Sequence, residues 1–222
     1  MKTRPLVAGA AALSLLLGGC SAIKVSSSED AASKPAQVGI SDEKSTASPS
    51  PTGVTIPEGM TETTVELGAE CPVEVSLALG PDWADGSGYE GYRLFTTVSE
   101  ALITVNCYED DEGTAKKLVD KSRERMFSTS GSAKLSEASG SLDGGEYWVV
   151  HGKLAAEDMR AVDEEDSTIF GVVAGISVDG RLFKIAVDML AQADDTQAQE
   201  QFRQMLPTVR LDGHELETPD LR

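Results

Sequence analysis

The sequence predicts an α+β domain in which a mostly antiparallel sheet is accompanied by two helices. Three observations lead to this fold class. Several segments alternate apolar and polar residues with period two, and two others repeat apolar residues at helical spacing. Asp179-Gly180 also separates two apolar runs, which is typical of a tight hairpin turn. The expected order is three strands, a helix, four strands and a helix.

The first three strands precede the first helix. In CPVEVSLAL, residues 71–79, the apolar residues share one phase with Cys71, which predicts a half-buried strand. YRLFTTV at 92–98 and ALITVNCY at 101–108 are the next two strands. Ser99-Glu100 between them suits a tight turn.

The first helix is expected within DDEGTAKKLVDKSRERMF, residues 110–127. Apolar and small residues recur there at helical spacing, namely at Ala115, Leu118, Val119, Ser122 and Met126. Acidic residues precede the first turn and arginines lie toward the end. Both biases complement the helix dipole.

Strand patterns resume in KLSEAS at 134–139 and EYWVVHGKL at 146–154, with a turn at 143–145 between them. TIFGVVAGISV at 168–178 and RLFKIAVDML at 181–190 form the hairpin around Asp179-Gly180. Because 169–178 is apolar or small on both faces, it is expected to be a central strand.

The last helix is expected within DDTQAQEQFRQML, residues 194–206. Ala198, Phe202 and Met205 lie on one stripe of this helix. Asp194 is the expected N-cap, and Pro207 ends the helix.

The first twenty residues resemble an export signal. Lys2 and Arg4 are followed by an apolar run at 6–17, which is too short for a membrane-spanning helix. Leu17-Gly18-Gly19-Cys20 then resembles the lipobox of bacterial lipoproteins. That family implies a diacylglyceryl group on Cys20, removal of the preceding peptide, and an anchor on the extracytoplasmic face of the cell membrane. A cleaved secretory peptide or an uncleaved anchor are the alternatives.

The domain boundaries follow from composition. Residues 1–19 are the predicted lipoprotein signal peptide, and 20–60 are the lipidated cysteine with a flexible linker rich in Ser, Thr and Pro. The globular α+β domain is predicted at 61–213, followed by a C-terminal tail at 214–222. The linker would reach roughly 35 Å as a random coil.

Charge and motif content exclude several function classes. The net charge of −18 disfavours nucleic-acid binding. GSGYEG at 86–91 formally matches a dinucleotide motif, but it runs into a strand, so a flexible loop is expected. With only two histidines and no zinc-ligand spacing, we predict no enzyme activity, no catalytic residues, no cofactor and no metal site. The acidic runs at 110–112 and 163–166 leave calcium open as an alternative to solvated loops.

Five residues are candidates for a structural or binding role. Cys71 and Cys107 both lie on the apolar side of their predicted strands in an exported protein, which predicts a disulfide; two buried free thiols are the alternative. Trp83, Tyr89 and Tyr92 surround the glycine-rich segment and are candidates for a binding surface. For Trp83, a place in the core is the alternative.

The element order resembles a known fold. The chain is similar to the PsbP/Mog-type α/β/α sandwich in the order of its expected elements. That order is a strand followed by Pro81-x-Trp83, a hairpin, a middle helix, a meander, and a last helix running into MLPTVRL. Over residues 62–211 the chain resembles in particular the actinobacterial lipoproteins of the LpqN/LpqT type, which place this domain behind a lipobox and a tether. The resemblance implies a non-enzymatic accessory or binding module, with a protein or lipid partner in the envelope.

A second function remains open from the residues themselves. The domain would instead carry a lipid or a small apolar ligand if its sheet and helix enclosed a cavity. Such a cavity would be lined by residues such as Phe183, Ile185, Val187 and Phe202. A filled core with exposed aromatic residues would favour the binding module.

Overall fold

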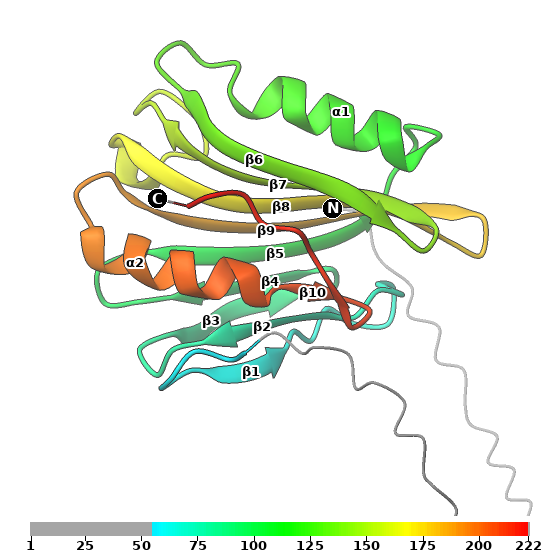
Figure 1. Ribbon diagram of the computed structural model, residues 1–222, viewed down its shortest axis with the longest axis horizontal. Helices are drawn as coiled ribbons and strands as arrows, with labels where there is room; N and C mark the ends of the chain where they lie inside the picture. The colour runs from blue at the N-terminus through cyan, green and yellow to red at the C-terminus, as the bar shows by residue number, and fades with distance from the viewer. Residues whose placement is uncertain (1–54, 222) are drawn as a thin grey trace, which may run out of the picture. The chain divides into compact units, whose positions relative to one another are not determined.

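The computed structural model describes residues 55–221, which form an α+β domain (Figure 1). Two α-helices accompany two antiparallel sheets, and this confirms the predicted fold class. The predicted signal peptide, Cys20 and most of the predicted linker lie outside the described residues. Within 55–221, no helix combines the length and the apolar character that crossing a membrane requires.

The larger sheet has seven strands in the order β3-β4-β5-β9-β8-β7-β6. Every neighbouring pair is antiparallel, and the long hairpins β6–β7 and β8–β9 form one half of the sheet. The strands are β3 (Ala84–Tyr89), β4 (Tyr92–Thr96), β5 (Leu102–Glu109), β6 (Ala133–Leu142), β7 (Gly145–Leu154), β8 (Ser167–Val178) and β9 (Arg181–Gln192). As predicted, β8 lies in the interior of the sheet and is buried on both faces over most of its length.

A second sheet, which the sequence did not indicate, joins the two ends of the domain. Its order is β1-β2-β10-β11, with β1 (Thr61–Thr64), β2 (Val75–Leu79), β10 (Arg210–Leu211) and β11 (His214–Glu215). The strand expected from Cys71 begins at Val75, and all five of its residues are buried rather than alternating. The expected tail at 214–222 packs on the domain, because β11 belongs to this sheet and Leu216 is buried.

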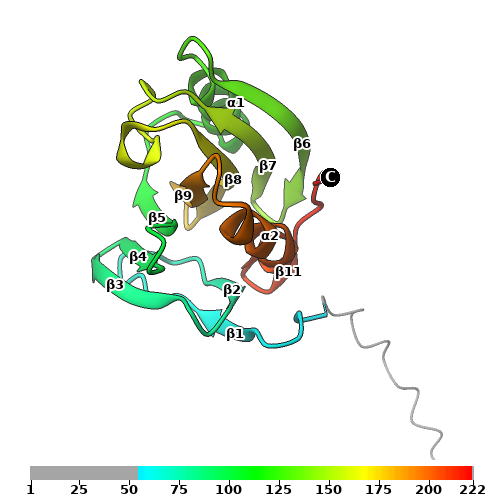
Figure 2. The same cartoon turned by 90° about the vertical axis from the view of Figure 1, so that its left-hand side faces the viewer.

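The two helices lie on opposite faces of the larger sheet (Figure 2). Helix α1 (Ala115–Met126) packs on β7 and β8, whereas α2 (Thr196–Met205) packs between β8, β9 and β2. Two short 3₁₀ helices, η1 (Val162–Glu164) and η2 (Leu206–Thr208), complete the chain. The N-cap of α2 is Asp195, whose carboxylate accepts from the Ala198 amide at 2.9 Å, and not Asp194 as expected.

Each face of the larger sheet has its own hydrophobic core. The larger core fills the space between the two sheets and α2, and it includes Leu77, Val172, Val187 and Phe202. The smaller core lies under α1 and includes Leu118, Trp148 and Val173. Alternation along β8 and β9 places neighbouring residues in different cores.

Close contact between α1 and β8 depends on a glycine. A Cβ atom at Gly175 would lie 2.8 Å from the Cα of Ala115, which is closer than non-bonded atoms allow. The helix therefore packs tightly on β7 and β8 and lies to one side of β9 and β5. This offset creates the cleft described below.

The segment 86–91 was expected to be a flexible loop, but residues 86–89 belong to strand β3 (Ala84–Tyr89) at the edge of the larger sheet, and 90–91 form the turn to β4. All six residues of β3 are exposed, and the pairing with β4 shifts between Asp85 and Ser87. Glycine-rich sequences have low strand propensity, so the hydrogen bonds to β4 rather than local preference form this strand.

Candidate functional site

A cleft of about 360 Å³ lies between α1 and the part of the sheet that the helix leaves uncovered. Its walls come from α1, from β5, β8 and β9, and from the loop at 158–160. The floor is apolar, because Leu118, Val173 and Ala186 line the cleft and are buried. The rim carries charged side chains of both signs.

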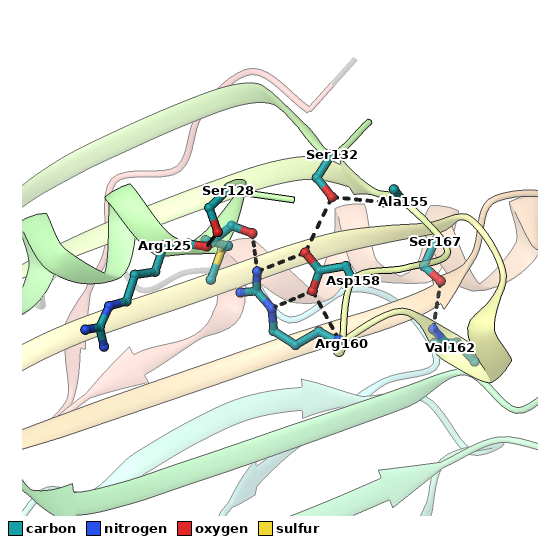
Figure 3. Close-up of polar contacts among 9 residues, drawn as sticks. Arg125, Ser128, Ser132, Ala155, Asp158, Arg160, Val162 and Ser167 are labelled. Atoms are coloured by element: carbon teal, nitrogen blue, oxygen red, sulfur yellow. Dashed lines mark hydrogen bonds and ion pairs between the residues drawn. The ribbon is translucent and has the colours of Figure 1, made fainter. Parts of the chain in front are cut away.

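Arg160 fixes one wall of the cleft (Figure 3). Its Nε donates to Asp158 Oδ1 at 3.2 Å, and its Nη2 donates to the main-chain carbonyl of Met126 at the end of α1. The last carbonyls of a helix lack partners within the helix, so Arg160 satisfies one of them. The 158–160 loop is thereby tied to the C-terminus of α1.

Asp158 is buried and has a second set of contacts. Its Oδ2 accepts from the Ser132 hydroxyl at 3.4 Å, and that hydroxyl in turn accepts from the Ala155 amide at 3.0 Å. Burial opposes ionisation of Asp158, but the hydrogen bonds and charge of Arg160 outweigh burial and lower its pKa. The wall of the cleft is therefore held by an ionised carboxylate and a guanidinium of fixed orientation.

Asp188 of β9 also lines the cleft, and its Oδ1 atom is buried without a hydrogen-bond partner. Burial raises the pKa of the Asp188 carboxyl, and the charges of Arg160 and Lys184 offset this only in part. The carboxyl group therefore retains its proton to a higher pH than an exposed aspartate. The one sequence signal for it was an acidic residue inside the apolar run RLFKIAVDML.

Of the basic residues at the rim, one forms an ion pair with a carboxylate and two do not. Lys121 forms an ion pair with Glu112 across the mouth of the cleft. Arg125 and Lys184 also line the cleft, and within 55–221 neither forms an ion pair with a carboxylate. The ammonium of Lys184 lies 5.9 Å from the ring centroid of Tyr108.

The acidic run at 110–112 borders the cleft. One ligand atom from each of Asp110, Asp111 and Glu112 lies within 4.8 Å of the others. Glu112 is paired with Lys121, and Asp110 Oδ1 accepts from the Glu112 amide at 2.9 Å. These contacts stabilise the turn that precedes α1.

Tyr89 and Tyr92 lie on the same face of the sheet as the cleft. Their rings stack with centroids 4.8 Å apart, and Tyr89 is 69% exposed. Across the strands, Tyr89 pairs with Tyr92, Tyr92 with Asn106, and Asn106 with Ala186 in the floor of the cleft. Paired residues point to the same face, so one row of side chains joins the two tyrosines to the cleft.

Trp83 lies in the core, which was the alternative to a place on the binding surface. It is 8% exposed, its ring centroid lies 5.5 Å from that of Phe202, and its Nε1 donates to Gln201 Oε1 at 3.0 Å. Trp83 is therefore not part of the surface with Tyr89 and Tyr92.

His151 of β7 is buried on the opposite face of the sheet and stacks on Phe170, with ring centroids 4.3 Å apart. Burial lowers its pKa, and the charges of Arg203 and Lys153 lower it further. The other histidine, His214, lies on β11 in the second sheet. His151 and His214 therefore lie in different sheets, and no strand pairing brings them together.

Cys71 and Cys107 form the predicted disulfide, with Cα atoms 5.8 Å apart. Cys107 is in β5 of the larger sheet, and Cys71 precedes β2 of the smaller one. The bond therefore links the two sheets covalently. The predicted lipidation site, Cys20, lies outside the described residues.

No known protein family matches the sequence, and no curated protein is similar to it. Among solved structures, the chain is similar to LpqN of Mycobacterium tuberculosis, described as involved in cell envelope biogenesis, at 14% identity over 68% of this chain and 91% of that one, with a TM-score of 0.47. It is also similar to cyanobacterial PsbP of Synechocystis, at 16% identity over 73% and 97% of the two chains, with a TM-score of 0.40.

A third similar structure is the Ran-binding protein Mog1p of Saccharomyces cerevisiae, at 14% identity over 69% of this chain and 96% of that one, with a TM-score of 0.41. These are the kinds of protein that the element order resembled. At such identities and TM-scores they transfer no residue roles, and the α+β assignment rests on the strands and helices described above.

Proposed function

We propose that this chain is an envelope lipoprotein, anchored to the cell membrane through lipidated Cys20, whose domain binds another envelope protein and catalyses no reaction. The lipobox-like Leu17-Gly18-Gly19-Cys20 supports the anchor. The Cys71–Cys107 disulfide supports an extracytoplasmic location, because such bonds persist in oxidising compartments.

The observation that carries the binding function is the stacked pair Tyr89–Tyr92 on the open face of the sheet. Tyr89 is 69% exposed and its ring stacks on that of Tyr92, so the pair presents an aromatic surface to solvent. Tyrosines supply large contact areas at low entropic cost and are enriched at the energetic centres of interfaces. Both tyrosines belong to paired strands, which hold the pair in one orientation before a partner binds.

The packing of the larger core favours this function over that of a carrier with its cavity between the sheet and α2. Phe183, Ile185, Val187 and Phe202, which would line a carrier cavity, are all buried in the larger core. These side chains pack against one another, so an apolar ligand would have to displace them.

The docking surface is tested by a photo-reactive phenylalanine analogue at Tyr89 in the full chain, in membranes of cells that produce it. Leu135 on β6, also exposed at 52%, is the matched control position. We expect a discrete crosslinked protein from position 89 and none of the same mass from position 135. Co-purification of that protein should fall for Tyr89→Ala and stay unchanged for Leu135→Ala. Identical crosslinks from both positions would contradict the proposal.

The anchor is tested separately at Cys20. Cells fed a labelled fatty acid should label the wild-type chain and not the Cys20→Ser chain, and globomycin should accumulate the uncleaved precursor. A Cys20→Ser chain that matures and partitions into membranes like the wild type would exclude lipid anchoring.

A further inference from the structure

The cleft beside α1 has the size and lining of a small-molecule site. Its volume of about 360 Å³ lies within the range of roughly 300–1,000 Å³ typical of ligand pockets. Its floor of Leu118, Val173 and Ala186 is apolar, and charged and polar side chains make up most of the remaining lining. An apolar floor with a few converging polar groups binds and orients an organic ligand.

The charge around this cleft differs from that of the whole chain. With 37 acidic and 19 basic residues, most cations of this protein have carboxylates available to them. Arg125 and Lys184 nevertheless lack an ion pair among residues 55–221, although both line the same cleft. Arg160 is held by Asp158 and Met126 through Nε and Nη2, and no contact within 55–221 occupies its Nη1. The charged groups of Arg125 and Lys184 and the Nη1 of Arg160 are therefore available to donate hydrogen bonds to an anion.

Asp188 favours an anion as well, despite being an acid. Burial raises its pKa, so the carboxyl group is protonated over a wider pH range and is then a hydrogen-bond donor. A protonated carboxyl beside an anionic oxygen donates to it and does not repel it. Its buried Oδ1 has no partner in the domain itself.

We propose that this cleft binds a small organic anion, a carboxylate or phosphate ester with an apolar body. The anionic oxygens contact Lys184 and Arg125, the Asp188 carboxyl donates to one of them, and the apolar body lies on Val173 and Ala186. The site is independent of the anchor at Cys20 and of docking at Tyr89. A small amine is the opposite ligand class. Asp110, Glu112 and Asp158 also line the cleft, but each of these carboxylates already has a partner within the domain, whereas Arg125 and Lys184 have no carboxylate partner within 55–221.

Isothermal titration of the purified full chain with matched probes tests the ligand class. Phenyl phosphate and benzoate carry the anion, benzylamine the cation, benzyl alcohol the ring alone and inorganic phosphate the anion alone. We expect the two organic anions to bind in the millimolar range or tighter, and the other three probes to bind at least about tenfold more weakly. Preferential binding of benzylamine, equal binding of inorganic phosphate, or no binding of either organic anion would overturn the proposal.

Variants locate the site. Lys184→Met and Arg125→Met should each weaken phenyl phosphate binding by about tenfold, the loss of one charge-assisted hydrogen bond. Lys116→Met is the matched control, since Lys116 lies on the same helix, is paired with Asp120 and does not line the cleft. Unchanged binding by both cleft variants, with circular dichroism confirming that they fold, would refute the assignment.

The pH dependence of ligand binding tests the role of Asp188. The other titratable or charged groups that line the cleft are Tyr108, Asp110, Glu112, Lys121, Arg125, Asp158, Arg160 and Lys184. Wild-type affinity for benzoate, whose charge is constant across neutral pH, should fall as pH rises and Asp188 ionises, whereas Asp188→Asn keeps a donor without a charge and should remove that part of the fall. Identical pH profiles for the two proteins would exclude a contact between the anion and Asp188.

Discussion

Asp188 on β9 lies directly opposite Gly171 on β8, and its Oδ1 borders the space that a side chain at Gly171 would take. A Cβ atom at Gly171 would lie 3.3 Å from Asp188 Oδ1 and 3.4 Å from Val150 Cγ1. A side chain at position 171 would therefore crowd this carboxyl, whose Oδ1 is buried. This pairing explains how an acid is accommodated beside the core under α1.

Asp188→Asn should stabilise the domain at neutral pH. Burial raises the pKa of Asp188, so the folded state binds the proton more tightly than the unfolded state. The resulting cost is absent below the unfolded pKa of about 3.9 and grows as pH rises from there to the folded pKa. We expect Asp188→Asn to raise the free energy of unfolding by roughly 1–3 kcal/mol at the top of this range.

Urea denaturation of both proteins between pH 3 and pH 8 measures this difference. The two free energies of unfolding should converge near pH 3 and separate as the pH rises. A constant difference across the whole range would mean that Asp188 does not titrate between the folded and unfolded states.

Arg160→Met should destabilise the domain by about 1–3 kcal/mol, since it leaves buried Asp158 without its main donor and frees the Met126 carbonyl. Adding Asp158→Asn to this variant removes the unpaired charge and should recover part of the loss. The free energies of unfolding of both single variants and the double variant give the coupling energy. Strictly additive effects would show that the pair does not act as a unit.

His151→Gln should reduce the sensitivity of the domain to acid. Burial, and then the charges of Arg203 and Lys153, lower the pKa of His151, so the unfolded state binds its proton more readily. Wild-type stability should therefore be complete above about pH 6.5 and fall as pH decreases from there toward the folded pKa. Thermal unfolding from pH 8 to pH 5 should show a smaller decline for His151→Gln. An equal decline would indicate that other groups cause the loss.

Replacing both Cys71 and Cys107 with serine should lower the free energy of unfolding by about 3–4 kcal/mol, the value for closing a loop of this length. Guanidinium denaturation of the variant and of the wild type, with and without reductant, measures the loss. Reductant should destabilise the wild type and leave the variant unchanged. Labelling of both thiols in unfolded, unreduced protein would show that the bond is not formed.

Local patterns were sufficient to predict most of the larger sheet and both helices. Helix α1 begins at Ala115 and ends at Met126, within the segment in which its apolar stripe and charge bias were found. Asp179 and Gly180 both adopt positive φ in the β8–β9 turn, as a tight hairpin requires. The disulfide also followed from sequence, because Cys71 and Cys107 share the phase of apolar neighbours.

Structure that depends on distant pairing was not predicted. β1, β10 and β11 have two to four residues each. β1 and β10 are strands because they pair with β2, and β11 because it pairs with β10. The cleft likewise depends on the offset of α1 from β9 and on the 158–160 loop, neither of which has a sequence pattern. The one available sequence signal, an acidic residue at Asp188 in an apolar strand, was not used to predict a site.

The bond between Cys71 and Cys107 also closes the main chain into a ring that contains β2, β3, β4 and the part of β5 up to Cys107. The exposed edge strand β3 lies inside this ring, together with the turn at 90–91 that follows it. One cut there opens the ring but releases no fragment, so the nicked protein remains a single molecule until a reductant reaches the bond.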